Sequence, residues 1–594
     1  MKNLLFAKRI KMGMQVFLLL TMLIFNFGPS NSSTAYAAAP GNDDFASATV
    51  IPGISYTNTL DLTDATQDTT DPDNVGPCDG SQLNRGNNTV WYTYTPTAKE
   101  LIALNTIGSE YSPGDDMDTY LAVWTGTEGN LTLVKCDDDN FVGQTSELTF
   151  KALPGVTYYI EVANYNCDFG DPDGCGPTLG GTLVFNAQIS NTHVTIAKQL
   201  KGSYYIDTGK SVRATYASMN KGPVLVEGSL NQPVVAALGV KYKQGGKYVS
   251  YSQTMGFPAE QATTEYYFPW YATTSSQSSQ LRVANVSDQD TTVDVYVKGV
   301  LKGSYPLTQG TAQLIPPYSG VNAGPVYVVS TNPAANIVAS MRVVYKRSGK
   351  NVSYSELMGY PKEKLTTSYL FPRNINNTAL KSQLRVANAG LVATDVKVYI
   401  NNVLKKTISA LAPDTAVQVP IPGTGVMRVE SANPAVNIIT SLRQIYYQNG
   451  VLVSYSELMG YPEDQLTTSY AFPWYTNNTT MATKLYIVNV SNVNTTVEIY
   501  IGGDLKGTPI SLAAGKVIAK SYAGNIGPVR VDSTVLGANI LVSMQIIYKP
   551  YGVPVSYGES TGYPYLAAQP TTEYWFPWYT KSSSIITQML IGYP

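Results

Sequence analysis

The chain has 594 residues, a net charge of −2, and 14% charged residues against roughly 25% in average soluble proteins. Its single histidine, His193, leaves little room for Ser-His or Cys-His nucleophile chemistry. Neither a Gly-rich phosphate loop nor a dense basic run is present. We therefore expect a protein that is not an enzyme and does not bind nucleic acid.

Residues 1–39 have the features of a secretory signal peptide. Basic residues precede an apolar stretch over 16–27, and small residues at 35–39 suit cleavage. The apolar stretch is too short to cross a bilayer comfortably, and no later stretch approaches the length of a span. We expect an exported protein, extracellular or at the cell surface, with no membrane span after the signal peptide is removed.

The remaining chain uses the residues of strands and turns. Tyr, Thr, Val, Ser, Asn and Gly are abundant, and short alternating runs such as residues 292–297 are common. Residues 41–190 carry 22 acidic and 4 basic residues, whereas 191–594 carry 20 acidic and 32 basic. We therefore expect an all-β protein in which an acidic domain, residues 40–190, is a functional unit separate from the rest.

The acidic domain shows five segments of one family in the expected order. They are NDDF (42–45), VWYTYTP (90–96), DTYLAVWTG (118–126), CDDD (136–139) and GVTYYIEV (155–162). On these segments the domain resembles the bacterial pre-peptidase C-terminal domain, a small jelly-roll-like β-sandwich appended to secreted proteins. The resemblance implies a domain that binds or targets and is not itself catalytic, although no peptidase domain accompanies it here.

All the cysteines of the chain lie in this domain. An even number in an exported domain favours two disulfides, and four cysteines permit three connectivities. We favour pairing the first with the second and the third with the fourth; a thiolate metal site is the alternative, although no close Cys-x-x-Cys pair is present. The cysteines are Cys78, Cys136, Cys167 and Cys175.

Aspartates gather at two places in the same domain. If the strand that starts near residue 118 lies beside the turn after residue 136, several carboxylates converge, and hard oxygen ligands in a flexible loop suit Ca²⁺. The alternatives are solvated turn formers, or a carboxylate pair for glycoside hydrolysis hidden in the cluster. The candidate calcium ligands are Asp115, Asp116, Asp118, Asp137, Asp138 and Asp139.

Roughly two thirds of the chain repeats with a period near 102 residues. A Met-Gly-Phe-Pro-like motif recurs at Gly256, Gly359, Gly460 and Gly562, which lie 103, 101 and 102 residues apart. Such a period is the size of a small domain rather than of a solenoid unit. The last strand favours four complete units, although it could instead open a truncated fifth. We expect repeats at 191–288, 289–390, 391–492 and 493–594.

Each repeat carries several short alternating segments separated by turn residues, which is typical of an immunoglobulin-like sandwich. The repeats resemble β-sandwich repeats of large exported bacterial surface proteins. Their linkers, such as residues 388–390 and 489–492, are short. We therefore expect tandem β-sandwich domains in an extended, semi-rigid rod.

Aromatic residues follow a Phe-Pro pair in three of the four repeats and are candidates for holding a sugar ring. The second repeat has Arg373 and Asn374 instead, which favours a structural role in which Pro ends a strand ladder. The candidate glycan-binding residues are Trp270, Tyr271, Trp474, Tyr475, Trp578 and Tyr579.

A carboxylate precedes the recurring glycine at Glu356, Glu457 and Glu559, whereas the first copy has Gln253. These side chains could contact a ligand. A turn whose glycine adopts a conformation that other residues avoid explains the motif more simply. Gln in one copy also argues against an acid–base role.

These features predict a non-catalytic surface or extracellular-matrix protein for adhesion or attachment, with a calcium-binding acidic head on a repeat stalk. The alternatives are a carbohydrate-binding, lectin-like array of repeats, and a noncatalytic subunit of an exported degradative system. The expected partner is a cell-envelope or extracellular polysaccharide, or another surface protein.

Overall fold

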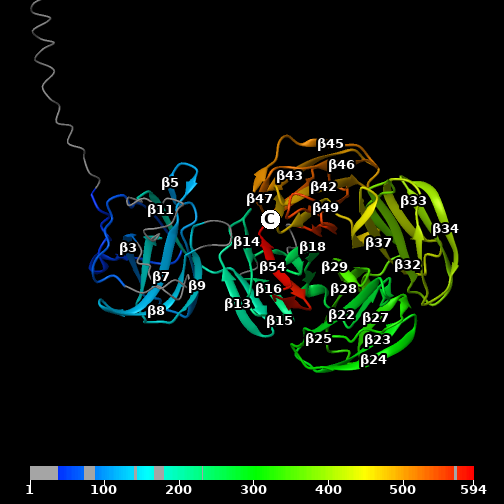
Figure 1. Ribbon diagram of the computed structural model, residues 1–594, viewed down its shortest axis with the longest axis horizontal. Helices are drawn as coiled ribbons and strands as arrows, with labels where there is room; N and C mark the ends of the chain where they lie inside the picture. Colours follow the sequence, from blue (N-terminus) through cyan, green and yellow to red (C-terminus); the bar gives the residue numbers. More distant parts are fainter. Residues whose placement is uncertain (1–37, 73–86, 139–143, 166–179, 230–231, 567–570) are drawn as a thin grey trace, which may run out of the picture. The chain divides into compact units, whose positions relative to one another are not determined.

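The computed structural model describes residues 38–72, 87–138, 144–165, 180–229, 232–566 and 571–594 (Figure 1). The expected signal peptide therefore lies almost wholly outside the described residues. Strands dominate the described chain, and the prediction of an all-β protein built from β-sandwiches is confirmed. The 3₁₀ turns whose bounds both lie in these ranges are η1 (Phe45–Ser47), η3 (Ala259–Gln261), η4 (Lys362–Lys364) and η5 (Glu463–Gln465).

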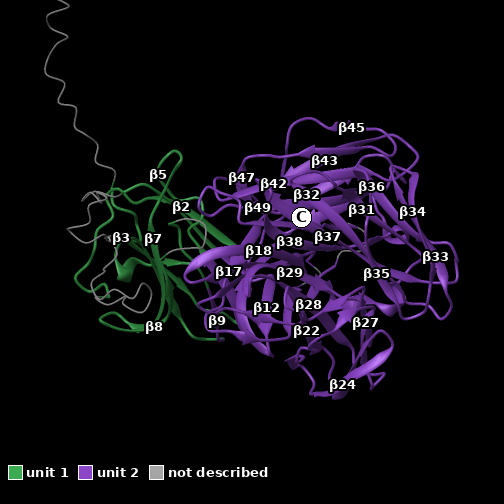
Figure 2. Ribbon diagram, turned by 45° about the vertical axis from the view of Figure 1, so that its right-hand side comes forward, with its two compact units in different colours: residues 1–98, 105–148, 154–186 green, residues 99–104, 149–153, 187–594 purple. Residues whose placement is uncertain are grey.

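The chain forms two compact units (Figure 2). The first comprises residues 1–98, 105–148 and 154–186, and the second comprises 99–104, 149–153 and 187–594. Strands β4 (Glu100–Asn105) and β9 (Glu147–Ala152) thus belong mostly to the second unit. The division at residue 186 lies close to the expected end of the acidic domain at 190.

The first unit contains a five-stranded sheet with the order β1-β3-β10-β7-β8. Tyr92 of this sheet stacks on Phe185 of β11 with ring centroids 4.2 Å apart, so two layers face each other as in a sandwich. The strands are β1 (Thr49–Val50), β2 (Tyr56–Asp61), β3 (Asn87–Tyr94), β5 (Glu110–Ser112), β6 (Asp115–Asp116), β7 (Thr119–Thr127), β8 (Asn130–Asp137), β10 (Tyr158–Asn164) and β11 (Thr182–Ile189).

The second unit contains four modules, which we call I to IV, each a sandwich of two antiparallel sheets. In module II the sheet orders are β24-β23-β27-β20-β30 and β25-β22-β28-β29. Val293, Val295 and Val297 alternate along β23 and are buried, as the period of two requires. The strands of module II are β20 (Glu265–Phe268), β21 (Tyr271–Ala272), β22 (Gln277–Asn285), β23 (Thr291–Val297), β24 (Val300–Leu307), β25 (Ala312–Leu314), β26 (Asn322–Ala323), β27 (Val326–Ser330), β28 (Ile337–Arg347), β29 (Lys350–Met358) and β30 (Tyr360–Pro361).

Modules III and IV repeat this arrangement. Module III consists of β31 (Ser368–Asn374), β32 (Leu380–Asn388), β33 (Thr394–Ile400), β34 (Val403–Leu411), β35 (Ala416–Pro420), β36 (Gly425–Ser431), β37 (Ile438–Gln448), β38 (Val451–Met459) and β39 (Tyr461–Pro462). Module IV consists of β40 (Ser469–Phe472), β41 (Tyr475–Asn477), β42 (Met481–Asn489), β43 (Thr495–Ile501), β44 (Asp504–Leu505), β45 (Ile510–Leu512), β46 (Val517–Lys520), β47 (Gly524–Ile526), β48 (Val529–Ser533), β49 (Ile540–Tyr548), β50 (Ser556–Thr561) and β51 (Tyr563–Pro564).

Module I is assembled from both ends of the repeat region. It consists of β12 (Thr192–Ile196), β13 (Gln199–Tyr204), β14 (Ser211–Ala214), β15 (Asn220–Lys221), β16 (Val224–Gly228), β17 (Val235–Gln244), β18 (Lys247–Met255) and β19 (Phe257–Pro258), together with β52 (Glu573–Phe576), β53 (Tyr579–Thr580) and β54 (Ile585–Gly592).

The strand pairing corrects the expected repeat boundaries. Strand β22 was expected to close the repeat 191–288, but it pairs with β25 and β28 of the next repeat. The same shift displaces the boundaries of 289–390, 391–492 and 493–594, because β32, β42 and β54 pair in the corresponding way. The period of a repeat fixes the length of a module but not its phase, which depends on the partner that each strand finds.

The repeats close on themselves, so the structure contradicts the extended rod. The final strand β54 lies between β14 and β17, with Ser211 opposite Gly592 and Val235 also opposite Gly592. β52 and β53 pair likewise with β16 and β15. In Figure 1 the red C-terminal strand accordingly lies among the teal strands of module I. The four modules therefore form a ring rather than a stalk.

One strand from each module, β18, β29, β38 and β50, lies at the centre of the ring and contacts the equivalent strands of both neighbouring modules. A serine hydroxyl on each strand accepts a hydrogen bond from a tyrosine N–H on another, which fixes the relative height of the strands. The bonds are Tyr354 to Ser250 (3.1 Å), Tyr455 to Ser353 (2.9 Å), Tyr557 to Ser454 (2.9 Å) and Tyr251 to Ser556 (3.2 Å).

Tyrosine pairs join adjacent modules beside these bonds. The closest pair, Tyr242 of module I and Tyr354 of module II, has ring centroids 3.5 Å apart and an interplanar angle of 3°. Such pairs contribute beyond the area that they bury. The equivalent pairs are Tyr345–Tyr455 (4.4 Å), Tyr446–Tyr557 (5.8 Å) and Tyr548–Tyr251 (5.8 Å).

Candidate functional site

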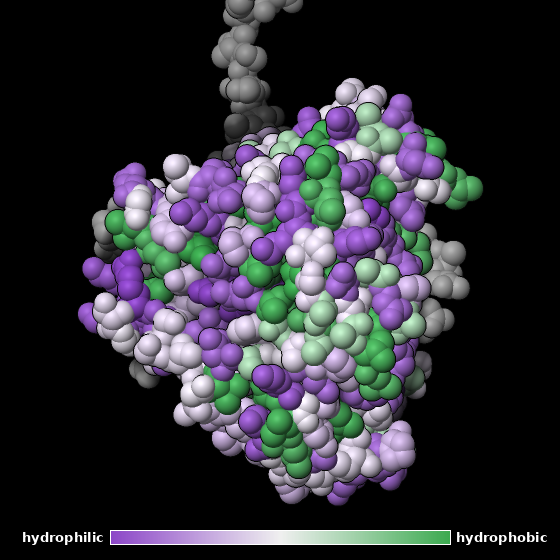
Figure 3. Space-filling view, turned by 90° about the vertical axis from the view of Figure 1, so that its right-hand side faces the viewer, coloured by the Kyte–Doolittle hydropathy of each residue, from purple (hydrophilic) through white to green (hydrophobic). Residues whose placement is uncertain are grey.

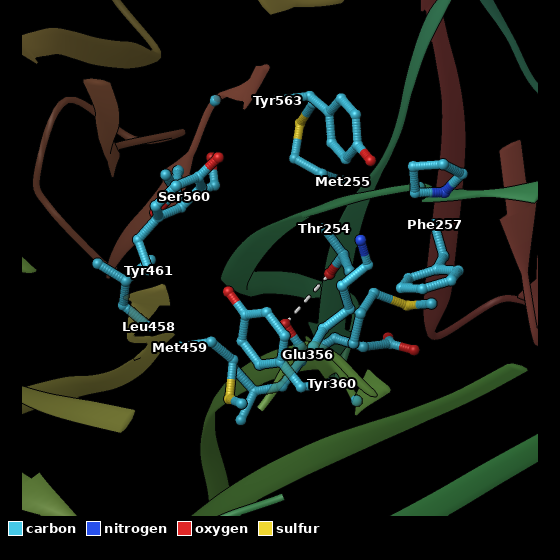
Figure 4. Close-up of a pocket in the computed structure, with 18 of the residues that line it drawn as sticks. Thr254, Met255, Phe257, Glu356, Tyr360, Leu458, Met459, Tyr461, Ser560 and Tyr563 are labelled. Carbon is cyan, nitrogen blue, oxygen red and sulfur yellow. Dashed lines mark hydrogen bonds between the residues drawn. The ribbon is translucent and has the colours of Figure 1, made fainter. Parts of the chain in front are cut away.

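The four copies of the glycine motif meet around one cavity at the centre of the ring (Figure 4). The cavity has a volume of about 300 Å³. Each module contributes the end of its central strand and the turn that follows. The lining includes Gln253, Thr254, Met255, Phe257, Gln261, Glu356, Met358, Tyr360, Lys364, Glu457, Met459, Tyr461, Gln465, Glu559, Ser560, Thr561 and Tyr563.

Four aromatic rings at equivalent positions, Phe257, Tyr360, Tyr461 and Tyr563, line the wall. The Tyr360 hydroxyl donates to the carbonyl of Gly460 at 2.9 Å, and the Tyr461 hydroxyl donates to the carbonyl of Gln465 at 3.2 Å. Each ring also meets, edge-on, a second aromatic ring that belongs to the sheet of the next module. These contacts hold the rings in place, so the wall is formed before any ligand arrives.

The recurring glycine allows this wall to form, for a reason other than the expected backbone conformation. Gly359 has no positive φ; a Cβ built on it would lie 2.9 Å from Cζ of Phe268 and 3.1 Å from Cβ of Tyr266. Gly256 and Gly562 are crowded by aromatic rings in the same way. The glycine is therefore required by close packing rather than by a special turn.

Below the aromatic wall lies a layer of buried carboxylates. At Glu457, Arg385 donates from Nη1 at 2.6 Å, Ser441 from Oγ at 2.6 Å and the hydroxyl of Tyr345 at 3.1 Å. Tyr345 comes from module II and Glu457 from module III, so this network crosses a module interface. With its oxygens occupied, this carboxylate is structural.

The other two carboxylates are neutralised in related ways. Glu356 faces Arg342 at 3.0 Å and Arg282 at 3.6 Å, and Glu559 faces Arg373 at 3.1 Å. Burial alone would raise the pKa of both carboxyls, but the attraction of the guanidinium groups together with hydrogen bonds to the carboxylates exceeds this effect and leaves each pKa below its usual value. Both side chains are therefore ionised at neutral pH.

The first copy has Gln253 where the others have glutamate, and the structure explains this exception. The positions of Arg282 and Arg385 are occupied in module I by Leu590, which packs against Trp474. A carboxylate there would have no guanidinium at this position, and Oε1 of Gln253 accepts a hydrogen bond from the Tyr251 hydroxyl at 3.1 Å instead. The neutral amide thus matches its surroundings.

Several polar atoms of the cavity lining have no hydrogen-bond partner within the described chain. They are Nε2 of Gln253, Oγ of Ser560 and Oγ1 of Thr561. Ser560 is 7% exposed. Buried polar groups in native proteins are usually satisfied, so these atoms indicate a place that water or a ligand occupies.

The expected aromatic platform for a sugar is contradicted by burial. Tyr271, Tyr475 and Tyr579 are at most 1% exposed, and Trp474 is 5% exposed. Their hydroxyl and indole groups bond within the protein; Tyr579, for example, donates to the carbonyl of Thr587 at 2.7 Å. These aromatics pack inside modules and at module interfaces, out of reach of a glycan.

The half-buried Trp270 and Trp578 also have structural partners. Trp270 donates from Nε1 to Asn322 at 2.9 Å, and its ring lies 5.4 Å from the guanidinium of Arg385 in the next module. Trp578 donates to Asn220 at 3.0 Å. The Phe-Pro motif therefore has a structural role, as the sequence favoured, but this role includes joining modules rather than only ending a strand ladder.

The candidate calcium ligands lie in the first unit. Asp115 and Asp116 form the exposed strand β6, and Asp137 accepts a hydrogen bond from the Glu147 N–H at 2.8 Å. Within the described ranges no three His, Cys, Asp or Glu side chains are placed to hold a metal ion. Asp139 lies outside the described residues, so calcium binding stays a prediction.

Cys136 forms a disulfide bond. Cys78, Cys167 and Cys175 lie outside the described residues, and the favoured connectivity therefore stays a prediction. His193 is a cross-strand neighbour of Ser203, with Nδ1 2.8 Å from Oγ. Ser203 is 6% exposed, so this pair offers no accessible nucleophile.

One buried polar group of the first unit was not predicted from the sequence. Glu161 on β10 is buried and accepts a hydrogen bond from Nε1 of Trp124 at 2.8 Å. Burial, with the nearby charge of Asp71, raises the pKa of Glu161 to about 8. The burial and the raised pKa of Glu161 depend on its neighbours on adjacent strands, whereas the segment 158–164 by itself has the pattern of an ordinary alternating strand.

Comparison with known proteins gives no family. No family profile and no curated protein matches the chain. A Clostridium perfringens ZmpB chain with an M60 catalytic domain and CBM51-1 and CBM51-2 domains aligns at 8% identity over 60% of this chain and 33% of its own length, with a TM-score of 0.11. A Bacteroides uniformis β-glucuronidase aligns at 7% identity over 83% of this chain and 100% of its own, with a TM-score of 0.15. Likenesses this weak carry no argument about function.

In the part of the chain that the structure describes, no helix is long and apolar enough to cross a membrane.

Proposed function

We propose that this chain is an exported, non-catalytic protein of the cell surface or extracellular matrix that attaches to a polysaccharide through the centre of the four-module ring. The observation that carries the proposal is the convergence of four copies of one motif on a single cavity. Four independent spacers would not need to share one wall. A ring whose last strand completes its first module is instead a rigid frame for one site.

The chemistry of the cavity favours binding over catalysis. The carboxylates beneath the aromatic wall are held by arginine, serine and tyrosine partners, and the pKa values of Glu356 and Glu559 are lowered, so neither has a proton to donate at neutral pH. A preformed apolar wall with a few polar groups is typical of a binding pocket. The proposed partner is a glycan of the cell envelope or matrix, because aromatic rings, amides and hydroxyls together suit sugar rings.

In this proposal the first unit is a domain related to the pre-peptidase C-terminal family that contributes targeting, with Ca²⁺ held by its aspartates. The proposal keeps sugar binding by the repeats from the lectin-like alternative, but with one central site per chain in place of one aromatic platform per repeat. Surface apolar area does not suggest another attachment mode on the face shown in Figure 3, where hydrophobic and hydrophilic residues are interspersed.

A depletion assay tests the proposal. The mature full-length chain is mixed with insoluble polysaccharides and isolated bacterial envelopes, with calcium or with chelator, and the unbound protein is measured. Met459→Trp fills the cavity, and Leu391→Trp adds the same ring at a residue that is 94% exposed. We expect depletion of the wild type and of Leu391→Trp, and loss of depletion for Met459→Trp.

Two outcomes would overturn the proposal. If no material depletes the wild type, attachment to glycan is wrong. If Met459→Trp is depleted as well as Leu391→Trp and chelator abolishes the binding of both, the first unit rather than the ring is the binding element. Thermal unfolding of both variants shows beforehand that each is folded.

A further inference from the structure

We propose that the axial cavity binds the terminal sugar of an acidic saccharide, one per chain, with the sugar carboxylate directed to Lys364. This inference rests on the proposed function, since it names the ligand class of the same site. Its support is the charge around the cavity, the asymmetry of the rim and the unsatisfied polar atoms of the wall.

The buried layer beneath the cavity holds more guanidinium groups than carboxylates. Glu356 alone faces both Arg342 and Arg282. Glu457 and Glu559 face Arg385 and Arg373. Arg443 of module III is held instead by aromatic rings, with its guanidinium 4.3 Å from the Tyr455 ring and 5.0 Å from the Tyr345 ring. Charges in a water-poor interior are screened little, so the excess of cations favours an anionic ligand.

The residues at the rim of the cavity differ between modules, and this difference also adds positive charge. The position five residues after the recurring glycine is Gln261 in module I, Lys364 in module II and Gln465 in module III, and all three line the cavity. Gln261 donates to the Tyr563 hydroxyl at 3.0 Å, and Gln465 donates to the Lys364 carbonyl at 3.4 Å. The Lys364 ammonium forms no ion pair within the described chain, and it is the cation that a bound carboxylate can meet.

The neutral part of a sugar fits the remaining wall. Nε2 of Gln253 is a donor without a partner, and the hydroxyls of Ser560 and Thr561 can each donate or accept. Ring hydroxyls of a sugar would satisfy them, while the apolar faces of the sugar would meet Phe257 and the tyrosines. A volume of about 300 Å³ is near the lower limit for ligand pockets, so one or two sugar rings fit rather than a threaded chain.

Isothermal titration calorimetry on the mature full-length chain tests the binding of acidic saccharides. The probes are trisaccharides of galacturonate, glucuronate and mannuronate, their neutral hexose counterparts, and a tripeptide with a free C-terminal carboxylate. We expect one site per chain for at least one uronate, with the neutral counterpart binding about tenfold or more weakly, equivalent to about 1.4 kcal/mol.

Two variants test whether the sugar carboxylate binds at Lys364. Lys364→Gln installs the residue that modules I and III carry at this position and should weaken uronate binding about tenfold while leaving the neutral counterpart unchanged. Lys362→Gln is the matched control, because Lys362 lies outside the cavity lining and pairs with Glu265 at 2.8 Å. Binding by Lys362→Gln should equal that of the wild type.

The inference is overturned if none of the uronates binds, if four bind per chain, if the tripeptide binds more tightly than every uronate, or if the two lysine variants lose affinity equally. Any of these results combined with depletion by an insoluble glycan removes this inference and leaves the proposed function intact. Absence of depletion by any material removes the proposed function itself.

Discussion

Arg373 in module III donates from Nη2 to Oε2 of Glu559 in module IV at 3.1 Å, although 186 residues separate them. Position 373 is tryptophan in the three other copies, and module IV has Tyr486 where modules II and III have Arg282 and Arg385. The Arg373 guanidinium lies 3.6 Å from the Tyr486 ring. One repeat therefore supplies the cation that the next repeat lacks.

This exchange predicts a compensating pair of mutations. Arg373→Trp restores the residue of the other copies but leaves Glu559 buried without a guanidinium, which should cost about 3–5 kcal/mol. Adding Tyr486→Arg places the cation where modules II and III carry it and should recover most of the loss. Chemical denaturation of the single and double variants measures both effects.

A matched control for this pair is Arg428→Ala. The Arg428–Glu430 pair is 3.3 Å apart and partly exposed, so its loss should cost at most about 1 kcal/mol. If Arg373→Trp is no more damaging than Arg428→Ala, or if Tyr486→Arg fails to rescue it, the exchange between repeats is not what stabilises module IV.

The neutral first copy gives a second prediction. Gln253→Glu introduces a carboxylate where Leu590 replaces the arginine, and the substitution should destabilise the ring by about 2 kcal/mol or more at pH 7. Because burial would raise the pKa of the new carboxyl, the penalty should grow as the pH rises above its unfolded value of about 4.3 and shrink at pH 4. Thermal unfolding at the two pH values checks this, and an equal effect at both would contradict it.

Ring closure gives a third prediction. Truncation after Ser584 removes β54 and leaves β14 and β17 without their shared partner. Hydrogen exchange should show loss of protection in β14 and β17, with β33 and β36 of module III little changed. A synthetic peptide of residues 585–594 should restore protection in trans. A truncated chain that keeps full protection in β17 would show that the last strand does not complete module I.

The first unit provides a pH prediction through Glu161. Its folded pKa of about 8 lies above its unfolded value, so the protonated form is the stable one in the fold. The stability of this unit should therefore decrease as the pH rises from about 4.5 to about 8. Glu161→Gln cannot ionise and should remove up to about 4 kcal/mol of this decrease. Fluorescence of Trp91 and Trp124 during unfolding at pH 5 and pH 8 tests it; an unchanged pH slope in the variant would exclude this role.

Local pattern in the sequence predicted the strands and the modules but not the site. The alternation at Val293, Val295 and Val297 suffices to place a strand and its buried face, because side chains on a strand point to the two sides in turn. The tyrosines of the Gly-Tyr-Pro turn recur in the sequence, yet nothing local shows that they share one cavity. The paired exchange of tryptophan for Arg373 and of arginine for Tyr486 was the visible signal that could have indicated contact between neighbouring repeats.

The sequence by itself determined that the chain is all-β, that it carries four modules of about a hundred residues, and that an acidic domain precedes them. These properties follow from residue spacing and composition, which act over a few residues at a time. The tertiary structure alone decided where each module begins, that the last strand completes the first module, and that the motif glutamates are neutralised. Each of these depends on which strand or charge the fold brings beside a residue, such as Arg385 beside Glu457, 72 residues away, or β54 beside β17, and such contacts leave no local pattern in the chain.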